Sequence, residues 1–168
     1  MSSSHSISRL FAGTLAACVA CASASTAAPR FPDAEPPSAM RVHVGRQWIG
    51  THDVTLRGDT LVVAFEPMMG SERPSVTRVV PTADAWREFW RAAEGAGVRA
   101  WPRECRNPGI VDGGGFTLEL AYGGERIEAS GVNAFPRRDG SCRTDGVHSD
   151  ELRDFLAAVS RLIGRQFP

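Results

Sequence analysis

The chain has 168 residues and a formal net charge of zero, and hydrophobic residues make up 42% of it. All 19 basic residues are arginine, and 19 acidic residues balance them. A neutral chain has no bulk attraction for polyanions, so the composition excludes nucleic acid as an expected partner. The length suffices for one domain with a single core.

The first residues have the pattern of an export signal. Arg9 precedes a short apolar run, residues 10–20, which is too short for a permanent membrane anchor. Ala22–Ala24 fits a small-residue cleavage site, so residues 1–24 are predicted to be a signal peptide. Leu15–Cys18 also resembles the lipobox of bacterial lipoproteins, so lipidation of Cys18 and simple secretion both stay open. Either way, we expect an exported bacterial protein, in the periplasm or anchored as a lipoprotein.

Two cysteines lie beyond this leader, Cys105 and Cys142. In an exported domain, a pair of cysteines most simply forms one disulfide, although two free buried thiols are the alternative. The bond is expected to stabilise the fold by about 3–4 kcal/mol by restricting the unfolded chain. No CxxC motif or histidine cluster accompanies the pair, so the sequence indicates no metal site, and nothing in it indicates a cofactor.

Residues 25–39 contain four prolines and few large aliphatic side chains. Because such a segment cannot bury enough apolar surface to order itself, it is predicted to be a Pro/Ala-rich tether. Residues 40–168 are then predicted to form a single domain.

Short strands are expected first in this domain. Val54–Arg57 and Leu61–Phe65 flank Gly58-Asp59, a dipeptide that favours a tight turn, so they are predicted to form a hairpin. After the loop Glu66–Pro74, Val76–Val80 is predicted to be a third strand.

Two amphipathic helices are predicted as well. The first begins after Thr82, whose hydroxyl can cap it, and its apolar side chains recur at helical spacing. These side chains are Trp86, Phe89, Trp90 and Ala93, and packing in the core is their expected role. The second helix covers Asp150–Ile163, with Ser149 or Asp150 as its cap and Gly164 beyond its end.

The most regular pattern lies in Asp112–Pro136, DGGGFTLELAYGGERIEASGVNAFP. A two-residue turn at Gly123-Gly124 places the apolar residues of both flanking strands on one face, and a slip of one residue would expose them all. The facing pairs are Tyr122 and Glu125, Leu120 and Ile127, Leu118 and Ala129, and Phe116 and Gly131. Asn133 is expected to support a turn through bonds from its side chain to the backbone.

Val98–Trp101 is predicted to be a further strand, followed by a loop that holds Cys105. A polar loop after the hairpin holds Cys142. Hairpins in place of crossovers, together with two helices, predict the fold class α+β, an antiparallel sheet of about four to six strands with two helices packed on one face.

Few residues indicate chemistry. Glu119 and Glu128 are expected to face each other on the polar side of the hairpin, with Arg126 diagonal to Glu119, where both carboxylates stay ionised. The histidines of the domain match no metal-binding or catalytic spacing; they are His43, His52 and His148. No GxSxG motif occurs, so the sequence indicates no catalytic residue.

A bond between Cys105 and Cys142 would bring together two loops rich in arginine. Their arginines are Arg103, Arg106, Arg137, Arg138 and Arg143. Their carboxylates are fewer: Glu104, Asp139 and Asp145. Because guanidinium groups bind phosphate and carboxylate in a bidentate way, this surface is a candidate site for an anionic envelope component or an acidic protein partner. The alternative is a solvated surface that largely neutralises itself.

A helix with Trp86 and Trp90, the hairpin motif, and a final helix together resemble a pattern in small uncharacterised bacterial exported proteins. The motif is Asp112–Leu120, a glycine turn and Ser130–Pro136. Phe116 and Phe135 stand where that pattern often has Trp and Tyr. The resemblance implies no established activity.

We therefore expect an exported cell-envelope domain that acts as a non-enzymatic binding or accessory module. The alternative is a small periplasmic hydrolase whose site assembles from distant His, Asp and Ser residues. A pocket with a histidine beside a carboxylate or serine would favour the hydrolase, and a flat arginine surface would favour binding. Membrane contact is expected only through a lipid anchor at Cys18.

Overall fold

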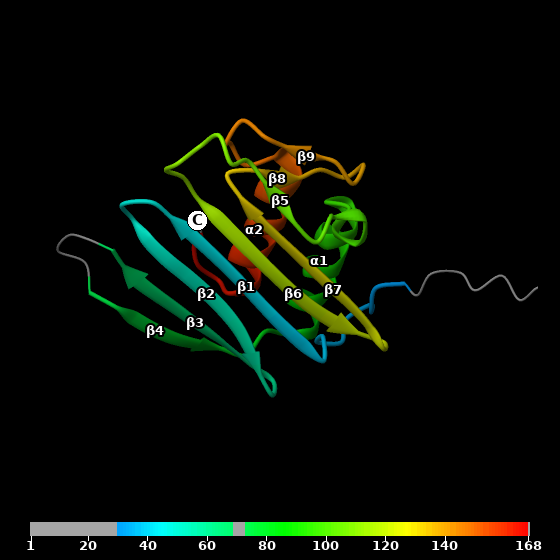
Figure 1. Cartoon of the computed structure of the whole chain (residues 1–168). Coiled ribbons are helices and arrows are strands. Elements are labelled where there is room, and N and C mark those ends of the chain that lie inside the picture. The colour runs from blue at the N-terminus through cyan, green and yellow to red at the C-terminus, as the bar shows by residue number, and fades with distance from the viewer. Residues whose placement is uncertain (1–29, 69–72, 168) are drawn as a thin grey trace, which may run out of the picture.

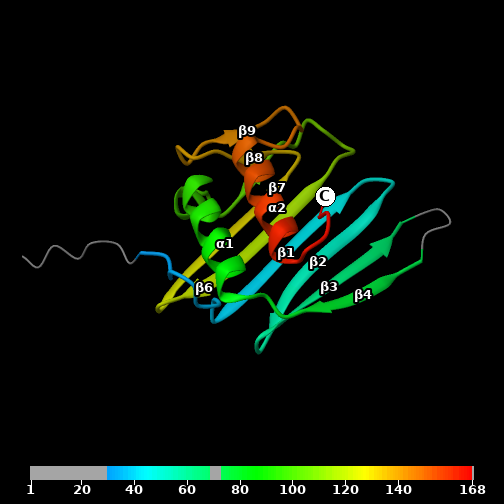
Figure 2. The same ribbon diagram turned by 180° about the vertical axis from the view of Figure 1, so that it is seen from behind.

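The computed structural model describes residues 30–68 and 73–167. The expected signal peptide and the lipobox cysteine lie outside the described residues. In the described part, two helices lie behind one large sheet, and both cover the same face of it (Figures 1 and 2). No helix in this part of the chain is long and apolar enough to cross a membrane.

The large sheet has seven strands in the order β4-β3-β2-β1-β6-β7-β5. They are β1 (Ala39–Arg46), β2 (Gly50–Arg57), β3 (Thr60–Pro67), β4 (Ser75–Val79), β5 (Cys105–Arg106), β6 (Gly115–Tyr122) and β7 (Glu125–Val132). Neighbouring strands are antiparallel except β5 and β7, which are parallel. A separate small sheet pairs β8 (Phe135–Pro136) with β9 (Cys142–Arg143).

The predicted glycine hairpin is confirmed. It is formed by β6 and β7, and all four predicted facing pairs occur in its register. Every second residue of β6, from Phe116 to Tyr122, is buried under the helices, while the residues between them lie on the open face. The predicted hairpin around Gly58-Asp59 and the strand after the loop are also present, as β2, β3 and β4.

The α+β class is confirmed, but the sheet is larger than the predicted four to six strands and is not wholly antiparallel, since it has seven strands and β5 is parallel to β7. The sequence patterns assigned no element to β1, although Met40, Val42 and Val44 alternate with polar residues and are buried at the centre of the sheet. The parallel strand β5 was missed because a strand of two residues has no periodicity to detect.

Both helices are confirmed. Helix α1 (Ala83–Gly95) is capped by Thr82, whose Oγ1 accepts a hydrogen bond from the N–H of Ala85 at 3.2 Å. Helix α2 (Asp150–Leu162) is capped in the same way by Ser149, which accepts from the N–H of Leu152 at 3.2 Å. The helices pack on each other, and their apolar faces close the core above the sheet.

The strand predicted over Val98–Trp101 is wrong, because Val98–Ala100 forms a short 3-10 helix, η1. Gly97 takes a left-handed conformation with a φ of 72° and ends α1. The N–H of Ala100 then donates to the carbonyl of Gly97 at 2.9 Å, which starts the tighter turn. Val98 and Trp101, three residues apart, are both buried by this turn.

The tether predicted over residues 25–39 lies against the domain over its described part. Phe31 packs between Trp90 and Tyr122, at ring-centroid distances of 5.1 and 4.8 Å. The carbonyl of Glu35 accepts a hydrogen bond from Nε1 of Trp90 at 2.8 Å. One aromatic anchor therefore holds a segment whose composition predicts no order, and the packed domain begins before Met40.

The two ends of the sheet differ. At one end lie the chain segment before β1 and the two-residue turns after Arg57 and Tyr122. At the other end Arg46 pairs with Gly50, and Gly50 pairs with Pro67. This second end, with residues 46–50, 67–68, 107–115, 132–133 and 144–149, is named the loop end. The green, yellow-green and orange loops gather there in Figure 1.

Candidate functional site

A cleft of about 470 Å³ opens at the loop end, where four segments far apart in the sequence meet. Its lining residues are Arg46, Gln47, Ile49, Gly113, Gly114, Phe135, Gly146, Val147, His148 and Arg153. Two neighbouring depressions, of about 280 and 410 Å³, also have Arg46 in their lining. Arg46 therefore lies at the junction of all three hollows, and we name the largest of them the Arg46 cleft.

The β1–β2 turn places Arg46 at this junction. The N–H of Ile49 donates to the carbonyl of Arg46 at 3.1 Å and closes the turn. Trp48, in the middle, has a φ of 65°, a left-handed conformation that is rare for a bulky residue. Gly50 has a φ of 135° and lies so close to β3 that a Cβ there would be 2.8 Å from Cα of Pro67. The turn is thus held tightly against the end of β3.

Asn133 holds the glycine loop that forms another wall of the cleft. This buried residue also has a left-handed φ, of 56°, and its N–H donates to the carbonyl of Gly114 at 3.0 Å. Its Nδ2 donates to the carbonyl of Ile110 at 2.7 Å. A Cβ on Gly113 would lie 2.6 Å from Cγ of Asn133, so the loop needs glycine there. The turn-supporting role predicted for Asn133 is confirmed, and its partners belong to the DGGG segment.

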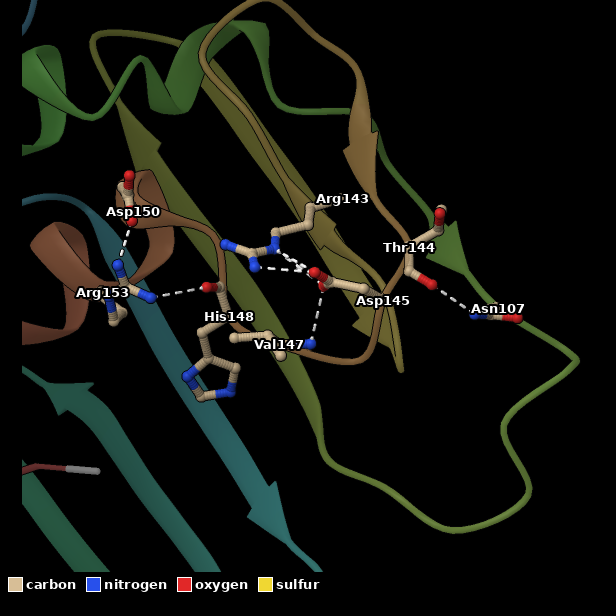
Figure 3. A network of polar contacts seen from close by, with 8 residues as sticks. All are labelled: Asn107, Arg143, Thr144, Asp145, Val147, His148, Asp150 and Arg153. Carbon is tan, nitrogen blue, oxygen red and sulfur yellow. Dashed lines mark hydrogen bonds and ion pairs between the residues drawn. The ribbon is translucent and has the colours of Figure 1, made fainter.

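The loop before α2 is held by an ion pair. Arg143 donates to the carboxylate of Asp145 from Nε and Nη2, each at 2.8 Å, and the N–H of Val147 donates to the same carboxylate at 3.1 Å (Figure 3). These bonds lower the pKa of Asp145 to about 2. Nδ2 of Asn107 donates to the carbonyl of Thr144 and ties this loop to the one before β6.

His148 comes from the same loop, and its ring points away from the Arg143–Asp145 pair (Figure 3). The ring makes an edge contact with Phe135, with centroids 4.5 Å apart. Burial lowers the pKa of His148, and the positive charges of Arg46 and Arg153 lower it further. The imidazole is therefore held toward its neutral form beside two guanidinium groups.

The Arg46 cleft is positive in charge. Arg153 forms an ion pair with Asp150 and donates to the carbonyl of His148 at 3.1 Å. Arg46 makes no ion pair with any of the described residues. The lining contains two arginines and a histidine but neither aspartate nor glutamate. Asp150 pairs with Arg153 from outside this lining, and the remaining donors, above all the guanidinium of Arg46, are suited to an anion.

The predicted disulfide between Cys105 and Cys142 is confirmed, and it joins β5 to β9. Three of the five arginines expected around it have acidic partners in the structure. The pairs are Arg103 with Glu128, Arg106 with Glu104, and Arg143 with Asp145. Arg137 and Arg138 are exposed and have no ion pair among the described residues. Anion binding by this group of five stays a prediction.

The acidic pair on the hairpin lies where the sequence placed it. Glu119 faces Glu128, and Arg126 bridges them, with Nε 2.6 Å from Glu128 and Nη2 3.4 Å from Glu119. Hydrogen bonds from Arg126 and Arg103 lower the pKa of Glu128. This arrangement on the open face of the sheet keeps Glu128 ionised, as a surface ion pair does, and not poised for proton transfer.

The other two histidines lie outside the Arg46 cleft. His43 contacts Asp53 across β1 and β2, with Nδ1 and Oδ2 2.9 Å apart, on the open face of the sheet. His52 packs against the rings of Phe65 and Phe167, at centroid distances of 4.5 and 5.8 Å. Across residues 30–68 and 73–167, no cluster of His, Cys, Asp and Glu could hold a metal ion.

Sequence reasoning identified His148 only as a scattered histidine and did not single out Arg46 or Arg153. The usable signal was the adjacent pair Trp48-Ile49, two large apolar residues in a turn. No protein-family model matches this sequence, and a comparison with curated proteins finds no significant match. The function is therefore inferred from the geometry of the cleft.

Proposed function

We propose that this domain is a non-enzymatic binding module of the bacterial cell envelope and that the Arg46 cleft takes an anionic group, a phosphate or a carboxylate. The observation that carries the proposal is the convergence of Arg46, Arg153 and His148 in a lining without a carboxylate. A guanidinium offers parallel N–H donors that match the oxygens of either anion. An arriving anion would also offset the charge of Arg46, which has no ion pair among the described residues.

Binding fits the site better than hydrolysis. A general base needs a group that orients it and a nucleophile within hydrogen-bond reach. No serine, aspartate or glutamate lines the Arg46 cleft, and the His148 ring lies against Phe135. The pair His43–Asp53 has the right atoms in contact, but it lies on the open sheet face. A site of this kind binds an anion without a group to attack it.

Calorimetric titration of the protein with inorganic phosphate, glycerol 3-phosphate and acetate tests the proposal. We expect Arg46→Gln and Arg153→Gln each to weaken binding by about tenfold, because a charge-assisted hydrogen bond contributes about 1.5–3 kcal/mol. Arg57→Gln and Arg161→Gln are the matched controls, since both arginines are exposed and lie outside the cleft. Arg57 is on β2, the neighbour of the strand that holds Arg46, and Arg161 is on α2, the helix that holds Arg153. The double variant Arg137→Gln, Arg138→Gln tests the arginine surface expected from the sequence.

Two results would overturn the proposal. One is an absence of measurable binding for all three anions. The other is an Arg46→Gln variant that binds as tightly as the unaltered protein. Loss of binding in the Arg137/Arg138 double variant alone would move the anion site to the arginine surface near the disulfide.

Export is the second part of the proposal. The disulfide between Cys105 and Cys142 supports it, because such bonds persist in oxidising compartments. Mass spectrometry of the protein recovered from a bacterial host is expected to show a chain that lacks the leader and has a mass two hydrogens below the fully reduced form. A lipid adduct on Cys18 would identify the lipoprotein form. A full-length chain with free thiols would contradict export.

A further inference from the structure

Large apolar side chains are exposed around the Arg46 cleft. They are Trp48 (64% exposed), Ile49 (48%), Met68 (58%), Val111 (94%) and Val147 (48%). We name this set the apolar collar. Its members come from four separate connections of the sheet: the β1–β2 turn, the end of β3, the β5–β6 loop and the loop before α2.

The collar surrounds the positive groups of the cleft. Ile49 and Val147 line the Arg46 cleft itself. Met68 and Val111 line the adjoining depression, which also has Arg46 in its lining. The N–H of Met68 donates to the carbonyl of Ile49 at 3.2 Å, so these two connections are joined by the backbone. The collar and the cationic centre therefore form one surface.

Trp48 is the most telling member. A left-handed conformation costs a non-glycine residue roughly 1–2 kcal/mol, and here it turns a large ring out to solvent. The other three tryptophans, Trp86, Trp90 and Trp101, are buried in the core. With 64% of its surface exposed, Trp48 gains little packing from folding to offset the cost of its conformation. An external partner that takes up the ring is the more economical explanation.

Exposed apolar residues are sparse elsewhere in the described ranges. Val132 also lies at the loop end, as the last residue of β7. The remaining two, Val76 and Val80, belong to the edge strand β4 and the residue after it. Val80 is the one of these side chains near the tight glycine turns, since Val79 pairs with Leu61 beside the Gly58-Asp59 turn. The apolar exposure is therefore concentrated at one end of the molecule.

We propose that the apolar collar docks on the surface of an anionic lipid bilayer, with its side chains in the interfacial region and a headgroup phosphate in the Arg46 cleft. Trp and aliphatic side chains beside arginines form the combination that membrane–water interfaces favour. Because the net charge is zero, attraction at a distance is weak, and insertion of the loop tips must supply most of the affinity. The headgroup contact rests on the proposed function of the cleft.

This contact is separate from the lipid anchor expected at Cys18. The described chain enters the sheet at Ala39, and the collar lies at the other end of β1, after Arg46 (Figure 1). A domain docked through its collar would hold the segment before β1 away from that bilayer. The two kinds of membrane contact can therefore be tested independently.

Vesicle co-sedimentation tests the docking, with Cys18→Ser present in every arm so that no lipid adduct contributes. We expect binding to phosphatidylcholine vesicles that contain phosphatidylglycerol and weaker binding to phosphatidylcholine alone. Trp48→Ala and Val111→Ser are each expected to lower the vesicle partition coefficient about tenfold, because burial of one such side chain contributes about 1.5–3 kcal/mol. Val76→Ser and Val80→Ser are the matched controls and should leave it unchanged.

Trp48 also provides a direct spectroscopic readout, since it is the exposed tryptophan of the four. Its emission is expected to shift to shorter wavelength on anionic vesicles and to be quenched by brominated lipids. Vesicle binding that leaves the emission unchanged, or that is equal in Trp48→Ala, would overturn the docking. So would self-association that depends on Trp48 without any vesicle binding, because the collar would then pair with a second copy.

The two proposals fail in different ways. A protein that binds free glycerol 3-phosphate but no vesicles retains the anion site and loses the docking. A protein that binds vesicles through Trp48 and Val111, with no effect of Arg46→Gln and no binding of free phosphate, retains the docking and loses the anion site.

Discussion

The two ends of the sheet connect their strands with segments of different length. At one end, β2 joins β3 and β6 joins β7 through two-residue turns, Gly58-Asp59 and Gly123-Gly124. At the loop end, residues 107–114 and 144–149 run outside the sheet and are linked by the hydrogen bond from Asn107 to Thr144, and a disulfide joins β5 and β9, the strands that precede them. The fold needs connections at both ends, but it needs long ones at neither.

The loop end therefore holds structure that strand pairing does not require. It contains both of the non-glycine residues with positive φ among the described residues, Trp48 and Asn133. It also contains the Arg46 cleft and most of the exposed apolar side chains. Strained residues and ordered loops on a rigid sheet are typical of functional regions. The end with the two-residue turns connects its strands without such loops.

The largest effect on stability is expected from removing the disulfide, because it links β5 to β9 at the loop end and nothing like it joins the two-residue turns. The double variant Cys105→Ser, Cys142→Ser is expected to lose about 3–4 kcal/mol in the free energy of unfolding, because the bond closes a loop with a sequence separation of 37 residues. Urea denaturation measures this loss. Amide exchange should rise in residues 107–114 and stay unchanged at Gly123-Gly124; an equal rise at both ends would contradict the comparison.

Glycines at the two ends provide the next test. Gly50→Ala is expected to cost about 3 kcal/mol, because its φ of 135° suits only glycine and the new Cβ would overlap the carbonyl oxygen of Glu66. Gly58→Ala is expected to cost only about 1 kcal/mol, since its φ is also positive but nothing lies within 4 Å of the new Cβ. Thermal or urea unfolding measures both. Equal losses would show that the loop end is no more tightly packed than the turn.

The same contrast governs what could be predicted from sequence. The β6–β7 hairpin and both helices were predicted because their side-chain periods are local and repeat several times. The strand β5 and the 3-10 helix after Gly97 were missed, since each has two or three residues and depends on tertiary contacts. The docked segment around Phe31 was missed because one aromatic residue in a proline-rich stretch has no period.

The candidate site was predicted less well than the fold. The disulfide followed from counting, because only two cysteines lie beyond the leader. Grouping arginines by loop did not indicate which of them pair with carboxylates; Arg143 pairs with Asp145, two residues away. Arg46 and Arg153 are more than 100 positions apart in the chain, and only the packing of α2 on the sheet brings them to one cleft. Residues that meet only in the folded domain form no pattern that a single sequence could show.

A smaller effect is expected from Asn133, which joins the hairpin motif to the glycine loop. Asn133→Ala should cost about 1–2 kcal/mol, because it loses the bond to the carbonyl of Ile110 and places alanine at a positive φ. Asn133→Gly removes the same side chain but tolerates the backbone, so it should recover roughly half of that loss. Urea unfolding of both variants measures the split, and an Asn133→Gly variant as unstable as Asn133→Ala would show that the backbone conformation carries none of it.

The smallest effect concerns pH and again separates the two ends. Burial, with Arg46 and Arg153 nearby, lowers the pKa of His148 below the ordinary value of 6.5, while Asp145 and Asp150 face their own arginine partners. Between the lowered pKa of His148 in the folded protein and its ordinary value of 6.5 in the unfolded chain, the unfolded chain therefore binds more protons. This contribution to stability is complete above pH 6.5 and is lost as the pH falls through the lowered pKa of His148.

Anion affinity should change in the opposite direction. An anion bound beside Arg46 and Arg153 offsets their charge and favours the protonated imidazole, so binding should tighten as the pH falls toward the lowered pKa of His148. Titrations with acetate, whose own charge stays constant over this range, measure the change, and His148→Gln should remove it. His43, on the open sheet face beside Asp53, provides the control, because His43→Gln should leave the pH dependence intact. A pH dependence that follows His43 instead would place the anion on the open sheet face and not at the loop end.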